Sequence, residues 1–184
     1  MPTSAADVVD ILSCLTRAGV EARLSGGWGV DALVGRQTRE HRDVDVAVDA
    51  NQLGAAQAAL AVLGFVVTTD WLPVRLELSE GCRHIDLHPL HYRPDGSAWQ
   101  AGLEATRFEY PSDAWTRGWV GRSKVICLTG ARQRLFHSGY PPRKVDLHDL
   151  LLLDEVQLRA RRADPPGSPS EGAASDSPRR RTAR

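Results

Sequence analysis

The chain has 184 residues, of which 42% are hydrophobic and 25% charged, as in an ordinary globular protein. Its length predicts a single domain. The 23 acidic and 23 basic residues cancel, so no charge excess points to nucleic acid or to a membrane surface. We expect neither a signal peptide nor a membrane span, because no apolar run is long enough for a span and the N-terminus lacks a basic segment. Three scattered cysteines are unlike a disulfide framework and favour a reducing cytoplasm.

The N-terminal segment predicts a helix followed by a short strand. Ser4 and Asp7 have the spacing of a capping box. Apolar residues then recur every three or four positions, which gives the helix one apolar face, and Gly19 ends the pattern. The apolar run 20–24 predicts the strand.

A glycine pair comes next. Gly26 and Gly27 precede the segment 30–34, which has the pattern of a helical turn closed by Gly35. Glycines between a strand and a helix let backbone N–H groups approach a phosphate at the positive end of the helix dipole. Taken alone, a glycine pair equally indicates an ordinary tight turn.

Two aspartates separated by one residue are the most informative feature. Asp43 and Asp45 lie in the alternating segment 42–49, which predicts a strand on which both share one face. Two carboxylates ~4 Å apart repel by about 4 kcal/mol at an effective dielectric near 20, so the pair favours a bound cation. Mg²⁺ prefers such oxygen ligands and commonly binds together with phosphates. With the glycine pair, the aspartates predict a site for a metal-bound nucleoside triphosphate.

Basic residues between the two motifs suit the charge of a triphosphate. They are Arg36, Arg39, His41 and Arg42. Lys144, at the start of the last predicted helix, is a further candidate phosphate contact. For each basic residue of the loop the alternative is a solvated position with salt bridges to Asp31 or Glu40. On the last helix, Asp146 and Asp149 are charges that the helix dipole alone would favour.

The remaining patterns complete an α+β (or α/β) domain over residues 1–162, a mixed sheet with helices packed on one face. Helices are predicted at 53–63, 131–137 and 145–160, and strands at 65–69, 73–79, 84–88 and 124–128. Residues 80–81 join two of these strands in a hairpin, whereas 92–121 has no clear pattern. Residues 163–184 are rich in Pro, Ser, Gly and Arg and predict a disordered tail.

A third carboxylate is a candidate for the same site. Nucleotidyl transfer needs a group that takes the proton from the attacking hydroxyl, and a second metal ion often assists. Asp86 lies in the strand 84–88 on the face opposite to Ile85 and Leu87. If that strand neighbours the strand of Asp43 and Asp45, three carboxylates converge; the alternative is a solvated aspartate.

Histidines accompany Asp86 on its strand face. Cys82, His84, Asp86 and His88 share that face, so a zinc site is an alternative. Neighbouring ligands on a flat strand make a poor tetrahedron, however. We therefore expect His84 and His88 to flank the active site as substrate contacts or supporting groups.

An aromatic residue near charged ones suggests a small-molecule contact. Trp71 is followed closely by Arg75 and Glu77. An aromatic face beside an acid suits a polar, cationic molecule that carries a ring. A single tryptophan more often serves packing.

Five blocks of sequence resemble the antibiotic nucleotidyltransferases of the DNA polymerase β-like superfamily. The blocks are 26–33, 39–46, 71–78, 85–89 and 135–140. Within the superfamily the chain looks most like the small lincosamide nucleotidyltransferases, whose relatives include the aminoglycoside 2″-adenylyltransferases. The likeness spans roughly residues 5–155 and leaves out the tail.

This resemblance implies a Mg²⁺-dependent transfer of AMP from ATP to a hydroxyl of an antibiotic, with release of pyrophosphate. A lincosamide is favoured over an aminoglycoside as the acceptor. By the motif match Asp43 and Asp45 bind the metal, and Asp86 is the general base or third ligand. Gly26 and Gly27 hold the triphosphate, and Tyr140 in the last block joins the candidate substrate contacts.

The sequence also departs from the family pattern. Ser25 stands where the superfamily favours an apolar residue, and Ala47 where lincosamide enzymes carry a further acid. Residues 92–121 match poorly and could hold the acceptor specificity. One alternative function is a minimal nucleotidyltransferase of a toxin–antitoxin pair, which binds or adenylylates a protein partner. A homodimer is a further expectation, since a second subunit could complete a site at the edge of so small a domain.

Overall fold

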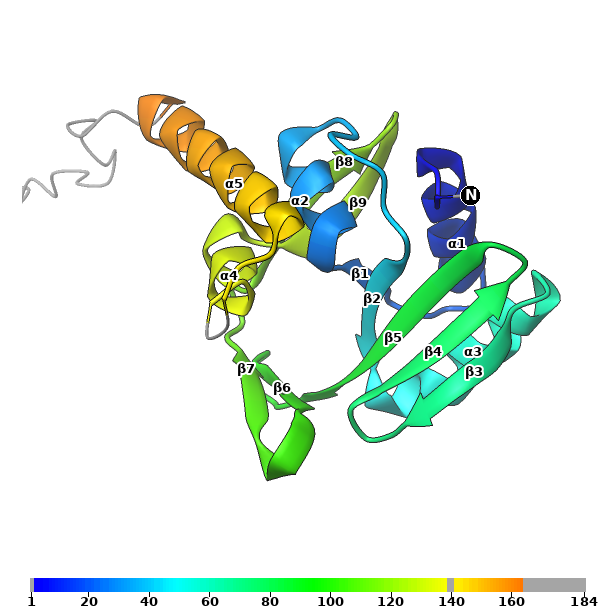
Figure 1. Ribbon diagram of the computed structural model, residues 1–184. Helices are drawn as coiled ribbons and strands as arrows, with labels where there is room; N and C mark the ends of the chain where they lie inside the picture. Colours follow the sequence, from blue (N-terminus) through cyan, green and yellow to red (C-terminus); the bar gives the residue numbers. More distant parts are fainter. Residues whose placement is uncertain (1, 139–140, 164–184) are drawn as a thin grey trace, which may run out of the picture.

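The computed structural model describes residues 2–138 and 141–163 (Figure 1). The α-helices are α1 (Ala5–Arg17), α2 (Gly26–Val34), α3 (Leu53–Val62), α4 (Gly130–Phe136) and α5 (Lys144–Ala163). The strands are β1 (Arg23–Leu24), β2 (Val44–Asp49), β3 (Val66–Trp71), β4 (Arg75–Glu80), β5 (Arg83–Tyr92), β6 (Ala98–Ala101), β7 (Arg107–Tyr110), β8 (Trp115–Val120) and β9 (Ser123–Leu128). Short 3₁₀ helices cover Ala50–Gln52 and Leu103–Ala105. Tyr140 and the predicted tail from residue 164 onward lie outside the described residues.

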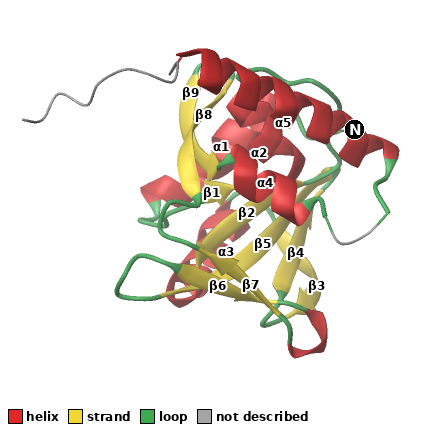
Figure 2. Cartoon of the chain, turned by 90° about the vertical axis from the view of Figure 1, so that its left-hand side faces the viewer, coloured by secondary structure: helices red, strands yellow, loops and turns green. Residues whose placement is uncertain are grey.

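The strands form a mixed sheet in the order β3-β4-β5-β2-β1-β9-β8, which confirms the predicted fold class. Strands β2 and β5 run parallel, as do β1 and β9, while the other neighbours are antiparallel. The short strands β6 and β7 continue from the end of β5 as a ribbon that projects from the sheet (Figures 1 and 2). The register of β2 and β5 pairs Asp45 with Asp86, so the two strands are neighbours and the condition for Asp86 to approach Asp45 is met.

One face of the sheet is apolar and covered by α1 and α3. Alternation on β2 puts Val44, Val46 and Val48 on that face, in one buried cluster with Ile11 of α1 and Leu60 of α3. Burying a side chain of this size stabilises the fold by about 1.5–3 kcal/mol. The same alternation turns the intervening residues of β2 to the opposite, open face. The polar residues of β2 are therefore gathered where no helix of this core covers them.

The last helix completes the other side of the molecule. α5 packs against α2, where Leu152 and Leu153 meet Val30, and it also contacts α4 (Figure 2). α2 begins at Gly26, earlier than the predicted turn 30–34, and Gly35 ends it in a left-handed conformation. The beginning of α5 is thereby brought close to the beginning of α2. Among the residues that the structure describes, no helix is both long and apolar enough to span a membrane.

Candidate active site

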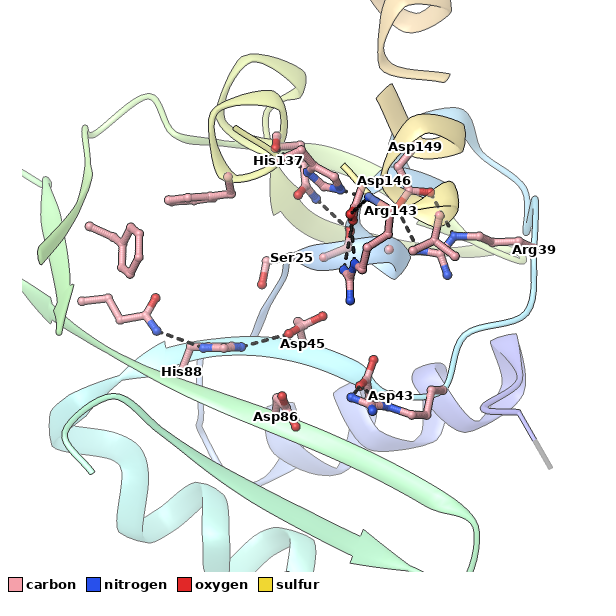
Figure 3. Close-up of a pocket in the computed structure, with 18 of the residues that line it drawn as sticks. Ser25, Arg39, Asp43, Asp45, Asp86, His88, His137, Arg143, Asp146 and Asp149 are labelled. Atoms are coloured by element: carbon pink, nitrogen blue, oxygen red, sulfur yellow. Dashed lines mark hydrogen bonds and ion pairs between the residues drawn. The ribbon is translucent and has the colours of Figure 1, made fainter. Parts of the chain in front are cut away.

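An open pocket of about 650 Å³ lies over the polar face of β2 and β5, between the first turn of α2 and the beginning of α5 (Figure 3). Its volume is in the range of small-molecule sites. Eight residues of its lining are candidates from the sequence: Gly26, Gly27, Arg39, Arg42, Asp43, Asp45, Asp86 and His88. The fold therefore brings the glycine pair, the acidic strand and two of the basic residues to one place.

The carboxylates form the floor of this pocket. Asp45, Asp86 and His88 each offer a ligand atom, and these atoms lie within 4.8 Å of one another. Asp43 lies one residue before β2 and lines the same pocket. Its Oδ2 accepts hydrogen bonds from Arg42 at 2.9 Å (Nε) and 2.6 Å (Nη2). The floor thus holds a close pair of carboxylates with a third acid beside it.

The two close carboxylates differ in acidity. Burial, together with the negative charge of Asp45, raises the pKa of Asp86 to about 6. Burial also opposes ionisation of Asp45, but the hydrogen bond from His88 and the positive charges of Arg75 and Arg42 act against it, and the pKa of Asp45 is lowered. At neutral pH both are ionised, and Asp86 is the group that takes up a proton first.

A hydrogen-bonded chain orients His88 toward Asp45. Nε2 of Gln100 donates to the carbonyl of Val74 at 3.1 Å and faces Nδ1 of His88 at 2.9 Å, while Oε1 accepts from Tyr110. Because the Val74 carbonyl can only accept, the amide of Gln100 must turn its NH₂ group toward that carbonyl and toward Nδ1 of His88. Nδ1 of His88 then accepts, so Nε2 carries the proton and donates to Oδ1 of Asp45 at 3.0 Å. The chain fixes the position of the Asp45 carboxylate.

The first turn of α2 lies directly against the acidic floor. Ser25 makes no side-chain cap, so the positive end of this helix is left to face the pocket. Gly26 has φ 57°, a left-handed conformation, and a Cβ at this position would lie 2.0 Å from Oδ2 of Asp45. At Gly27 a Cβ would lie 2.4 Å from Nη2 of Arg39. Both positions therefore require glycine, for reasons of space.

We expect Gly26→Ala to reduce activity strongly, by about a hundredfold. The new methyl group would push the Asp45 carboxylate out of place, and a left-handed alanine is strained by about 1 kcal/mol. Steady-state rates and the melting temperature of the variant measure the two effects. Gly19→Ala is the matched control, because Gly19 has φ 74° but no atom lies near its Cβ position. Equal loss of activity in both variants would show that backbone strain alone explains the result.

Other candidates from the sequence lie beside or outside the pocket. Arg75 is on β4, with Nε 3.6 Å from Oδ2 of Asp86, and it also pairs with Glu77 and lies over the ring of Trp71. Arg75, Glu77 and Trp71 therefore form one group of contacting side chains next to Asp86. Lys144 is the exposed first residue of α5 and does not line the pocket, although its neighbours Arg143 and Val145 do.

The loop histidine His41 and the candidate zinc ligands Cys82 and His84 do not line the pocket. Nε2 of His41 is 2.5 Å from Oδ2 of the buried Asp31, so this loop histidine belongs to the scaffold. Among the described residues, neither Cys82 nor His84 joins the potential metal-binding group with Asp86 and His88, and both side chains are exposed. The geometry therefore does not support the zinc alternative.

A family model decides the wider assignment. The sequence model of the aminoglycoside-2''-adenylyltransferase family matches residues 7–153. The chain belongs to this adenylyltransferase family. The recognition made from the sequence, an antibiotic nucleotidyltransferase, is thereby confirmed. The match ends within α5 and includes every element that lines the pocket.

Individual relatives agree with the family assignment. A lincosamide resistance protein of Staphylococcus haemolyticus is 35% identical over 147 residues, which cover 79% of this chain and 91% of that protein. The crystal structure of the lincosamide antibiotic adenylyltransferase LnuA with bound lincomycin has a TM-score of 0.77 and 32% identity, and covers 85% of this chain and 99% of LnuA. ANT(2")-Ia with adenylyl-2"-tobramycin, at 20% identity and TM-score 0.66 over 87% of this chain and 97% of its own, shares the fold.

Several pocket residues of this family member were missed in the sequence. Gln100, Phe108 and Tyr110 come from the segment 92–121, which had no clear pattern and forms β6, β7 and β8 with their connections. The last residue of α4, the residue after it, the residue before α5 and the first turns of α5 supply Phe136, His137, Arg143, Val145, Asp146 and Asp149. The block 135–140 carried a signal for two of them, whereas Asp149 was indistinguishable from an ordinary helix charge.

Proposed function

We propose that this enzyme transfers a nucleoside monophosphate, AMP from ATP, to a hydroxyl group of a lincosamide antibiotic and releases pyrophosphate. The observation that carries the proposal is the register of β2 and β5, which sets Asp45 against Asp86 beside the uncapped first turn of α2. The identity to a lincosamide resistance protein and the likeness to LnuA support the choice of acceptor.

The donor atoms of the pocket floor fit Mg²⁺. The carboxylates of Asp45 and Asp86 are close enough to raise the pKa of Asp86, and a divalent cation would relieve that repulsion. His88 already uses both ring nitrogens, on Gln100 and on Asp45, so oxygen donors are left for the ion. Asp43, Asp45 and Asp86 are therefore the proposed ligands. When bound, Mg²⁺ would neutralise charge on the phosphates and polarise the α-phosphoryl group.

The remaining residues bind and orient the reactants. Backbone N–H groups at Gly26 and Gly27 and the guanidinium groups of Arg39 and Arg42 hold the triphosphate. Asp86 accepts the proton of the acceptor hydroxyl, because its carboxylate lies on the pocket floor and is ionised at neutral pH. The hydroxyl oxygen forms a bond to the α-phosphorus as the bond to the bridging oxygen breaks, and pyrophosphate leaves with that electron pair.

The composition of the pocket favours a lincosamide over an aminoglycoside. A lincosamide combines one basic amine with an apolar part, whereas an aminoglycoside carries several amines and needs unpaired acids. At one end of the pocket Phe108 lies edge-on to Phe136, with ring centroids 5.7 Å apart. On the far wall the acids Asp146 and Asp149 are already paired with arginines. Beyond the acidic floor assigned to the metal, the pocket thus offers an aromatic surface at one end and acids on the far wall that arginines already neutralise.

Product masses test the proposal directly. The protein is incubated with each of four nucleoside triphosphates, Mg²⁺ and a panel of lincosamides and aminoglycosides. We expect a lincosamide that gains the mass of one nucleoside monophosphate, with ATP as the preferred donor. Labelling of a protein while every drug stays unmodified would instead favour the toxin–antitoxin alternative.

We expect Phe108→Ala to raise the KM for the lincosamide about tenfold and to leave the KM for ATP unchanged. Loss of one aromatic contact is worth roughly 1–2 kcal/mol, and 1.4 kcal/mol is a factor of ten. Steady-state kinetics with each substrate varied in turn measure both constants. Trp119→Ala is the control, because Trp119 is about as exposed but lies on β8 outside the pocket. A change in the KM for ATP alone would assign the aromatic end to the nucleobase.

The proposal also places the enzyme in the cytoplasm, where ATP is available. Cys14, Cys82 and Cys127 are free thiols, and two of them are buried, which agrees with a reducing compartment.

A further inference from the structure

The wall opposite the acidic floor carries five charged side chains of alternating sign. We call them the ionic wall, and they are Arg39, Asp149, His137, Asp146 and Arg143 (Figure 3). Arg39 donates two hydrogen bonds to Asp149, at 2.9 and 2.8 Å. Arg143 donates two from its side chain to Asp146, at 2.9 and 3.0 Å. His137 completes the wall: its Nε2 lies 3.6 Å from Oδ2 of Asp149.

Both ring nitrogens of His137 face acceptors. Nδ1 is 2.7 Å from the backbone carbonyl of Gln133, so Nδ1 must carry a proton. In a neutral ring Nε2 would then turn its lone pair toward the carboxylate of Asp149, which is repulsive. The doubly protonated imidazolium has an N–H group for each neighbour. The geometry therefore selects the charged form although only 8% of the side chain is exposed.

The acidic groups around His137 also favour its charged form. Asp149 raises the pKa of His137 above its ordinary value, burial opposes this, and the Gln133 carbonyl and Asp146 add to the increase. The positive groups of the wall, Arg39 and Arg143, are each held in a fork by one of these acids.

The charge of His137 decides the net charge of the wall. Arg39 lies against the first turn of α2, where a Cβ on Gly27 would be 2.4 Å from its Nη2. This is the place where the proposed function puts the phosphates. Asp149 holds Arg39 there but also cancels its charge, and Asp146 does the same to Arg143. With His137 charged the wall carries one net positive charge, and with His137 neutral it carries none.

We propose that His137 is a positioning residue for the nucleotide: it acts through Asp149, and its charge keeps the Arg39–Asp149 pair attractive to a triphosphate. This inference rests on the proposed function, because it assumes that phosphates bind at the first turn of α2. Nε2 of His137 faces Oδ2 of Asp149, the same oxygen that accepts from Nη2 of Arg39, and His137 supplies the positive charge that Asp149 removes.

The binding of a non-hydrolysable ATP analogue with Mg²⁺ tests the charge. Affinity is measured by calorimetry from about pH 6 to pH 9, a range that spans a raised histidine pKa. We expect wild-type affinity to fall as the pH rises through the pKa of His137, because the ionic wall then loses its net positive charge. His137→Gln should bind about tenfold more weakly at pH 7 and lack this fall, as one charge near a phosphate implies.

The matched control is His148→Gln. His148 lies on α5, with Nε2 3.1 Å from Oγ1 of Thr38, and does not line the pocket. It should show the wild-type affinity and pH dependence. The same pH dependence in wild type and in His137→Gln would overturn the inference. If the analogue binds no protein at all, both the inference and the proposed function fail.

A second measurement needs no variant. Nitrogen NMR of the histidine rings in the wild-type protein reports which nitrogens carry protons. We expect His137 to remain an imidazolium, with both nitrogens protonated, above the pH at which an ordinary histidine is neutral. A neutral His137 ring at pH 7 would overturn the inference even if the enzyme modifies its drug, so the two failures are distinguishable.

Discussion

Replacing Asp45 by asparagine is expected to slow nucleotidyl transfer about a thousandfold or more. Asp45 lies in register with Asp86, and His88 lowers its pKa against the effect of burial, so it is ionised at neutral pH. Asparagine keeps the shape but removes the negative charge that would bind a cation. A metal ion contributes several kcal/mol to such a transition state, and each 1.36 kcal/mol is a factor of ten.

Two measurements separate catalysis from metal binding in this variant. Pyrophosphate release gives the rate, and calorimetric titration with Mg²⁺ gives the affinity, which should also drop. Asp49→Asn is the matched control, because Asp49 lies on the same face of β2 but accepts from the backbone of Asn51 and does not line the pocket. Near-normal turnover by the Asp45 variant, with the fold intact by circular dichroism, would remove Asp45 from the metal site.

The acidic floor was accessible from the sequence because it depends on local periodicity. Alternation of apolar and polar residues predicted the strands that became β2 and β5, and it assigned Asp45 and Asp86 to the polar faces. The family resemblance then implied that the strands are neighbours. Only the register, which sets the two residues directly opposite each other, needed the structure.

The ionic wall was not accessible, because it joins distant parts of the chain. Arg39 and Asp149 are 110 positions apart, and nothing in the local sequence of either residue specifies the other.

The aromatic end of the pocket, Phe108 with Phe136, could not be predicted from the sequence for a different reason. β6 and β7 are only four residues each, too short for alternation to be recognised. The need for glycine at position 26 likewise depends on a tertiary contact with Asp45.

Asp86→Asn is expected to have two opposite effects, a more stable metal-free protein and a much slower enzyme. The folded protein holds the pKa of Asp86 at about 6, above the ordinary value of 3.8, because of burial and the charge of Asp45. The folded state therefore binds more protons than the unfolded state between these values, and ionised Asp86 destabilises the fold above pH 6. Asparagine removes this penalty, which is about 3 kcal/mol for a pKa raised from 3.8 to about 6 and already includes the opposing attraction of Arg75.

The gain in stability should depend on pH and on metal. It should be complete above about pH 6, shrink as the pH falls, and vanish near pH 4, where the carboxyl of both states is protonated. Melting temperatures across this range measure it. Mg²⁺ should raise the melting temperature of the wild type more than that of the variant. Asp10→Asn, at an exposed position of α1, is the control and should change neither stability nor rate.

The same variant should lose about 10² to 10⁴ in kcat, the usual contribution of a general base, with little change in KM. A loss in kcat shows that the Asp86 carboxylate acts in the transition state rather than in substrate binding. The gain in stability shows that the carboxylate is retained at the expense of the fold. An Asp86→Asn protein that is less stable than wild type at pH 7.5 without metal would contradict the assigned proximity of Asp45 and Asp86. A variant that changes only in KM would make Asp86 a substrate contact rather than the base.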